Sequence, residues 1–374
     1  MRDILATALA TGLDGLRSLQ LGDTVDPRAA TVLADAGLGR LCVPVAAGGH
    51  GASMTEAAEV LLALGAVDGS TALGFAMQVH TTGALRDGDA PAAVRDRVWR
   101  AVVDERAWLN NAATEEGGGS PARGAIPGTR AIEADDGTWR LSGEKTWTTW
   151  LPNLTHAFVS ARLDDRQRPH VGRFWVDLRG SGVERRDGFE ALGMRGSASG
   201  RLILDGAAGV LLQQRLAGDP DPAGPAPLAW FGVSIGAVYL GIGLGARDGV
   251  ARWALERRPG DGAQAVAELP SVRLRLGRMD ADLRAARLVL LAAARAWDER
   301  RDASDVALAK LVATRAAVSA TDAALRIAGG PGFLVGPLER AFRDARAGLI
   351  NPPLEDVAFG SFAARLLDDV RRDG

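Results

Sequence analysis

Cysteine, tyrosine and histidine are scarce in this chain of 374 residues, which contains one Cys, one Tyr and four His. The lone Cys42 excludes a disulfide within the chain. It lies in the apolar run Leu41–Val43, which is typical of a small core residue. Because a chain without disulfides suits a reducing compartment, we expect a cytoplasmic protein.

The four histidines show no spacing that a metal site would use, so the sequence predicts no metal. The formal net charge is −2, and we expect no nucleic-acid partner because a basic surface is missing. Hydrophobic residues make up 47% of the chain and charged residues 24%, as in ordinary soluble globular proteins.

One long uncharged run, residues 228–246, raises the question of a membrane span. It is long enough to cross a bilayer. However, it contains five glycines, has no basic flanks, and continues into the charged segment 247–258. We therefore expect a buried bundle helix and no membrane association. The N-terminal segment, with Asp3 and Asp14 and no sustained apolar region, predicts no signal peptide.

The hydrophobic periodicity and the composition of the sequence change twice along the chain. Residues 1–108 show helical periodicity, interrupted by a Pro- and Gly-rich loop near Pro44. Residues 109–222 contain short segments rich in Trp, Thr, Val and Phe between turn residues, which predicts an antiparallel β domain. Residues 223–374 return to long apolar helices that are typical of a bundle. The prediction is an α+β chain: an N-terminal α-helical domain, a middle antiparallel β domain and a C-terminal four-helix bundle.

Two neighbouring motifs lie in the predicted β domain. Residues 113–120 read ATEEGGGS, and residues 145–149 read KTWTT. The glycines of the first motif offer free backbone N–H groups that either bind a polar ring or an anion, or simply form a flexible turn. Trp147 is either part of a site or a core residue on a strand.

Further motifs follow in the C-terminal half. Residues 192–197 read LGMRGS, which alone is compatible with a polar turn, and residues 254–260 read ALERRPG. Residues 324–346 read ALRIAGGPGFLVGPLERAFRDAR, in which the glycines either end a helix or let the backbone approach a phosphate. A G-x-G-x-x-A match at 241–246 lies inside a helical run without a preceding strand, so we do not interpret it as a dinucleotide site.

Taken in this order, the motifs resemble those of the acyl-CoA dehydrogenase flavoprotein family. The resemblance implies FAD as the cofactor and a homodimer or homotetramer, because the flavin site of that family is shared between subunits. It also implies an acyl thioester or another small-molecule substrate, with an electron-transfer flavoprotein or oxygen as acceptor. By the same resemblance the cofactor-binding residues are Thr114, Gly119, Ser120, Trp147, Thr149, Arg257, Gly329, Gly330 and Gly332. Glu116 and Gly260 depart from the family pattern, which has a proline and an aromatic residue there.

The family places its catalytic glutamate nine residues after the Arg of the Arg-Asp-Ala motif, and in this chain that position is Pro352. Proline supplies neither a carboxylate nor a backbone N–H. The nearest acids are Glu355 and Asp356, which are either a displaced base or N-terminal charges of the last helix. We expect FAD-dependent α,β-dehydrogenation of an acyl thioester, on CoA or a carrier protein, with Glu355 or Asp356 as base. The alternatives are a flavin-dependent monooxygenase on the same fold and a base-less partner subunit of a dehydrogenase.

Overall fold

A computed structural model describes residues 1–117, 125–135, 137–163, 169–186, 188–260 and 264–373. Gly119 and Ser120 of the first motif lie outside the described residues. The chain divides into two compact units. The first unit comprises residues 1–53, 73–191 and 195–230, and the second comprises residues 54–72, 192–194 and 231–374. The domain boundaries that the sequence predicts, after residues 108 and 222, remain a prediction.

The N-terminal hundred residues are helical, as predicted. Helix α2 illustrates why: Pro27 precedes its first residue, and the Asp26 carboxylate accepts the Arg28 N–H at 2.9 Å, which satisfies one free donor of the first turn. The helices are α1 (Asp3–Arg17), α2 (Arg28–Asp35), α3 (Met54–Val67), α4 (Gly69–Asp87) and α5 (Ala92–Asp104).

The middle of the chain forms one seven-stranded sheet. Its strands are β1 (Leu109–Ala112), β2 (Arg130–Glu133), β3 (Trp139–Thr148), β4 (His156–Leu163), β5 (His170–Asp177), β6 (Val183–Arg186) and β7 (Gly200–Leu216). Because β5 pairs with both β7 and β4, the strands β4, β2, β3, β7 and β5 close into a ring. The prediction of a purely antiparallel domain needs correction: β4 runs parallel to both β1 and β2, so the sheet is mixed.

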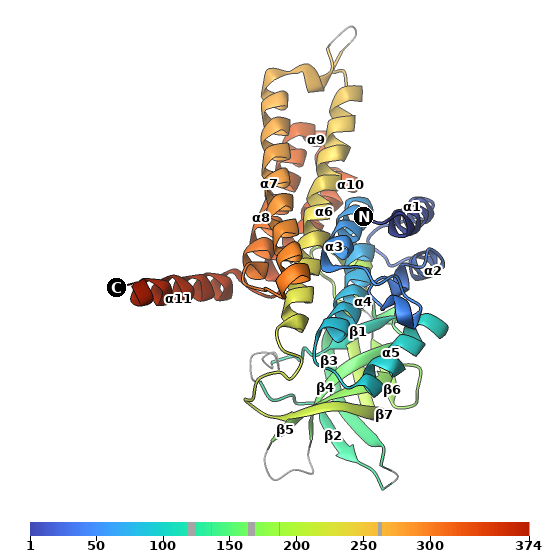
Figure 1. The fold of residues 1–374 in the computed structure, drawn as a ribbon. Coiled ribbons are helices and arrows are strands. Elements are labelled where there is room, and N and C mark those ends of the chain that lie inside the picture. The colour runs from blue at the N-terminus through green and yellow to red at the C-terminus, as the bar shows by residue number, and fades with distance from the viewer. Residues whose placement is uncertain (118–124, 136, 164–168, 187, 261–263, 374) are drawn as a thin grey trace. The chain divides into compact units, whose positions relative to one another are not determined.

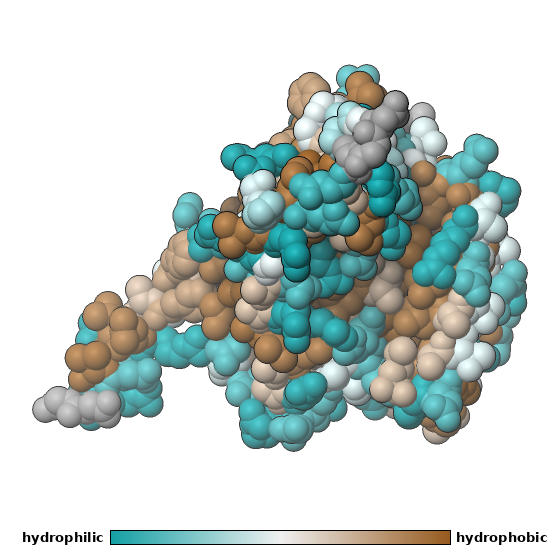
Figure 2. All heavy atoms as spheres, turned by 90° about the horizontal axis from the view of Figure 1, so that it is seen from above, coloured by the Kyte–Doolittle hydropathy of each residue, from teal (hydrophilic) through white to brown (hydrophobic). Residues whose placement is uncertain are grey.

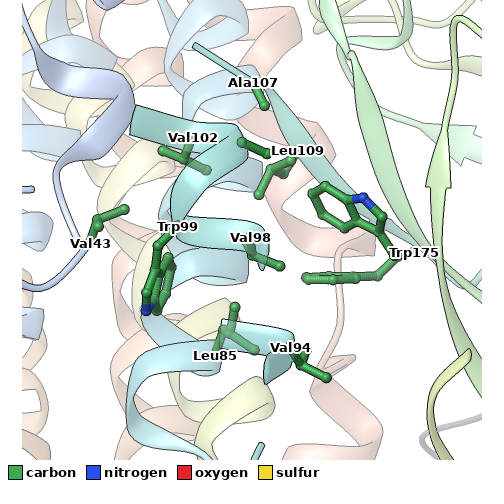
Figure 3. Packing of buried hydrophobic residues seen from close by; sticks show 11 residues of the cluster. Val43, Leu85, Val94, Val98, Trp99, Val102, Ala107, Leu109 and Trp175 are labelled. Carbon is green, nitrogen blue, oxygen red and sulfur yellow. The ribbon is translucent and has the colours of Figure 1, made fainter. Parts of the chain in front are cut away.

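Helix α5 packs on the sheet through an apolar stripe at helical spacing. Val94, Val98 and Val102 recur every fourth residue, are buried, and belong to the same cluster as Trp175 of β5 (Figure 3). This cluster fixes the helix to the strands and contains no charged side chain.

The second unit contains the predicted helical bundle, in which α6, α7, α8 and α10 run side by side (Figure 1). The C-terminal helices are α6 (Ala226–Glu256), α7 (Pro270–Arg300), α8 (Val306–Ala328), α9 (Gly330–Phe333), α10 (Pro337–Ile350) and α11 (Glu355–Asp373). Helix α11 leads away from the bundle, and Figure 2 shows hydrophobic side chains gathered along it. Its exposed apolar residues include Val357, Phe359, Leu366, Leu367 and Val370.

The glycines of the uncharged run bring helices into close contact. A Cβ on Gly241 would lie 2.6 Å from the Leu62 carbonyl oxygen of α3, and one on Gly243 would lie 2.9 Å from the Ala317 Cα of α8. The G-x-G-x-x-A match is therefore a packing surface inside α6. Although α6 is long and apolar enough to cross a membrane, 78% of its most apolar window is buried inside the protein, as for a core helix.

Candidate flavin site

Trp147 is presented by a distortion of strand β3. The pairing of β3 with β7 shifts register between Lys145 and Thr148, and Trp147 has a φ of 54°. Such a bulge re-aims a side chain, and a positive φ is unfavourable for a bulky residue. Trp147 is 52% exposed. The core alternative for Trp147 is therefore wrong, and the sequence motif presents an aromatic face to solvent within the described chain.

A row of hydroxyl groups follows the tryptophan. Thr149 Oγ1 lies 3.0 Å from Ser199 Oγ, which in turn lies 3.0 Å from Ser197 Oγ. The backbone joins the same residues, because the Trp150 N–H donates to the Ser197 oxygen at 2.8 Å. Among the described residues the buried Thr148 Oγ1 has no hydrogen-bond partner. The motifs at 145–149 and 192–197 thus meet in a cluster rich in hydroxyl donors and acceptors.

The segment that precedes the glycine loop is anchored by a buried ion pair. Lys145 Nζ lies 2.5 Å from Glu115 Oε1, and the same carboxylate accepts hydrogen bonds from Gly128 and Thr129. Burial alone would raise the pKa of Glu115, but hydrogen bonds from Lys145 and Thr129 lower it to about 2. Burial lowers the pKa of Lys145, and Glu115 opposes this shift.

Thr114 belongs to the same anchored segment, because its carbonyl oxygen accepts the Thr146 N–H at 2.9 Å. The pairing of Glu115 with Lys145 is not among the predictions made from the sequence. The available signal was one acid and one base in two motifs that were expected to lie together.

In the second unit, residues 192–194 dock onto the Arg-Asp pair of α10. The Met194 N–H donates to the Asp344 carboxylate, and Arg343 Nη1 donates to the Leu192 oxygen at 3.2 Å. Asp344 is buried, and burial raises its pKa to about 6 although the Met194 hydrogen bond opposes this. Residues 192–194 are therefore more than a polar turn, because they are hydrogen-bonded to α10 within the second unit.

The glycines after α8 form a tight helix-to-helix turn. Gly329 has a φ of 62° and a ψ of −140°, a conformation reserved for glycine, and its N–H donates to the Leu325 oxygen at the end of α8. The helix-end interpretation is thus confirmed, and the binding role remains a prediction. Gly329 and Gly330 are exposed with open space where a Cβ would be, whereas a Cβ on Gly332 would meet Ala328 Cβ at 2.7 Å.

Arg257 follows the last residue of α6 and is exposed. Figure 1 shows the last residues of α6 and of α8 at the same end of the bundle. Arg257 and the glycine turn therefore lie at one end of the second unit, while Trp147, Thr149 and Thr114 belong to the first unit.

The position expected to hold the base is a firmly held turn between α10 and α11. The ammonium group of the buried Lys310 donates to the carbonyl oxygens of Asn351 at 2.6 Å and Pro353 at 3.1 Å, on either side of Pro352. The Asn351 amide donates to Tyr239 Oη at 2.8 Å. Burial lowers the pKa of Lys310 to about 8, and the charge of Glu355 opposes this.

Of the two candidate bases, Glu355 is engaged and Asp356 is exposed. Arg315 donates to both carboxylate oxygens of Glu355, at 2.8 Å and 3.1 Å. These hydrogen bonds lower the pKa of Glu355, which makes the carboxylate a weaker base. Both acids lie in the first turn of α11, as the helix-charge interpretation expects.

Comparisons with known proteins assign the family. The family model "Acyl-CoA dehydrogenase, C-terminal domain" matches residues 226–351, and the model "Acyl-CoA dehydrogenase, middle domain" matches residues 110–207. The chain is 33% identical to the acyl-CoA dehydrogenase family protein YdbM of Bacillus subtilis, over 90% of this chain and 88% of that protein.

Two solved structures show how widely the fold is used. Butyryl-CoA dehydrogenase from Megasphaera elsdenii has a TM-score of 0.85 at 20% identity, covering 98% of this chain and 99% of that chain. The dibenzothiophene monooxygenase TdsC from Paenibacillus sp. A11-2, in its FMN-bound form, has a TM-score of 0.82 at 20% identity, covering 96% and 95%. At these identities the likeness shows the fold and leaves the reaction open.

Proposed function

Because the chain belongs to the acyl-CoA dehydrogenase family, we propose that it binds FAD and dehydrogenates an acyl thioester between its α and β carbons. Its relatives are flavin oxidoreductases, and the chain is an enzyme of that class. The observation that carries the proposal is the exposed Trp147 ring beside the hydroxyl row Thr149–Ser199–Ser197.

These residues fit a flavin. An exposed aromatic face suits a planar ring, and hydroxyl groups with spare bonding capacity, together with the unpartnered Thr148 Oγ1, suit its polar edge. We propose that Thr114, Gly119 and Ser120 also contact the flavin, and that Arg257 and the turn at Gly329, Gly330 and Gly332 hold the diphosphate. A bound flavin supplies a hydride acceptor; the protein must supply the base for the α-proton.

Near Pro352 the described residues offer no carboxylate that is ready to act as the base. Pro352 has no carboxylate, and Glu355 must leave Arg315 before it can accept a proton. Asp356 is exposed to water, which disfavours proton abstraction from a weak carbon acid. The proposal therefore requires that substrate binding either frees Glu355 from Arg315 or shields Asp356 from water.

The lack of an available base at Pro352 and Glu355 supports two alternative functions. A flavin-dependent monooxygenase does not need to deprotonate a carbon acid, and a base-less partner subunit performs no chemistry of its own. Pro352 and the engaged Glu355 favour both alternatives over dehydrogenation. TdsC shows that the fold itself is compatible with monooxygenation.

The remaining partners belong to this proposal. We propose a homodimer or homotetramer, supported by three consecutive apolar residues that are largely exposed in the chain alone: Phe333 (81%), Leu334 (70%) and Val335 (96%). The acceptor would be an electron-transfer flavoprotein or oxygen. The location would be the cytoplasm, supported by the single buried Cys42.

The decisive experiment is anaerobic reduction of the purified holoprotein by a panel of acyl thioesters. Bleaching of the flavin absorbance supports dehydrogenation, and its rate in Glu355→Gln and Asp356→Asn identifies the base, because losing a base slows reduction by about 10² or more. No bleaching by any thioester, together with oxygen uptake in step with a hydroxylated product when reduced flavin is supplied, would establish the monooxygenase instead.

A further inference from the structure

The exposed Trp147 is one member of an aromatic stack. The Phe189 ring lies 4.3 Å from the Trp147 ring, centroid to centroid, with an interplanar angle of 29°. Phe189 comes from the segment between β6 and β7, where its N–H donates to the Ser199 oxygen at 3.2 Å. Ser199 is the middle hydroxyl of the row that begins at Thr149, so the stack and the row share one backbone anchor.

An arginine contacts the second ring of the stack. The Arg201 guanidinium carbon lies 5.7 Å from the Phe189 ring centroid, which is the geometry of a cation–π contact. Arg201 is held in turn by Glu144 at 3.0 Å and Glu116 at 3.2 Å. Glu116 is one of the residues that depart from the family pattern, and here it has a defined partner.

The stack covers one face of the Trp147 ring and leaves the other face uncovered. Phe189 covers one face of the indole, yet Trp147 remains 52% exposed, which leaves the opposite face and the edges of the ring for a ligand. A positive φ and an exposed indole are both unfavourable for the free protein, and such a combination persists where a function requires it.

We infer that Phe189 is a positioning residue of the flavin site: it fixes the Trp147 ring and leaves a single aromatic face for the isoalloxazine. This inference rests on the proposed flavin binding. The stack acts by preorganisation, because a ring that is already held loses less conformational freedom when the ligand binds. The ring quadrupole of Phe189 is required, since apolar volume alone would not align the indole.

The test is a titration of apoprotein with FAD, and in parallel with FMN, followed by flavin fluorescence. Phe189→Ala should weaken flavin binding by about three- to tenfold, the range that one aromatic pair contributes. Phe189→Leu keeps most of the side-chain volume without the ring, and we expect it to weaken flavin binding by a similar factor. Phe189→Tyr keeps the ring and should stay within about twofold of the parent.

Phe359→Ala is the matched control, because Phe359 is also a partly exposed ring with an arginine, Arg315, over its face at 5.1 Å. It should bind flavin like the parent. If either Phe189→Leu or Phe189→Ala binds flavin as tightly as the parent, the positioning role is overturned while flavin binding stands. A parent protein that binds neither flavin would overturn the proposed function itself.

Discussion

Lys145 Nζ lies 2.5 Å from Glu115 Oε1, and this contact ties the start of the glycine loop to the strand that presents Trp147. The Lys145 side chain is fully buried, and Glu115 also accepts hydrogen bonds from Thr129 and Gly128. Glu115 and Lys145 are thirty residues apart in the sequence, and their contact holds the two motifs together.

Glu115→Gln should destabilise the protein by about 3 kcal/mol or more, because it leaves the buried Lys145 ammonium uncompensated. Urea unfolding measures this loss. Glu116→Gln is the control: its exposed pair with Arg201 should contribute less than about 1 kcal/mol. Since the pKa of Glu115 is lowered to about 2, its contribution is present above the unfolded value of about 4.5 and disappears as the pH falls through 2. Equal stability of the two variants would contradict the anchoring role.

Asp344 should give the opposite pH dependence. Burial raises its pKa from 3.8 to about 6, so the stability it contributes is present below pH 4 and is lost as the pH rises through 6. The difference corresponds to about 3 kcal/mol at pH 7. Asp344→Asn keeps an oxygen for the Met194 N–H but carries no charge. Relative to the parent, its free energy of unfolding should therefore rise by about that amount between pH 4 and pH 7. A constant difference across this range, measured by urea unfolding, would show that Asp344 is not the group responsible.

The sequence predicted the helical segments because apolar periodicity, such as that of Val94, Val98 and Val102, is a local signal. It predicted the family because the family motifs are contiguous in the sequence. It did not predict the parallel pairing of β4 with β1 and β2, because parallel pairing joins segments that are distant along the chain. For the same reason the sequence leaves open whether Glu355 is a displaced base or an N-terminal charge of the last helix. Its partner Arg315 lies forty residues earlier, and helical periodicity carries no information about which surface charges meet.

Gly241→Ala should destabilise the second unit by about 1–3 kcal/mol, because the added methyl group would press on the Leu62 carbonyl oxygen of α3. The higher helix propensity of alanine acts against this effect. Gly277→Ala on α7 isolates that propensity, since Gly277 is exposed with open space around it, and it should stabilise by up to about 1 kcal/mol. Thermal or urea unfolding of both variants measures the difference. If Gly241→Ala stabilises the protein instead, α3 and α6 are less closely packed than the structure shows.

Gly330→Glu should abolish FAD retention while the chain stays folded. The position has open space for a side chain, so the expected effect is repulsion between the new carboxylate and the flavin diphosphate. Gly277→Glu places the same residue at another open glycine of the same unit and should retain the cofactor. Flavin released from each purified protein is quantified by absorbance. Full FAD occupancy in the Gly330→Glu variant would remove the glycine turn from the site.

Pro352→Glu tests whether the pocket still accepts an acyl thioester. Lys310 holds the carbonyl groups on both sides of residue 352, so a glutamate introduced there would enter a turn that is already fixed. It would restore both the missing carboxylate and the missing backbone N–H, and we expect anaerobic flavin reduction by a thioester to accelerate by about 10² or more. Pro352→Gln restores the N–H without the base and should recover only the smaller part of this gain. If a broad panel of thioesters bleaches the flavin of neither the parent nor the two variants while FAD remains bound, the protein does not accept an acyl thioester. The monooxygenase or partner-subunit function then takes precedence.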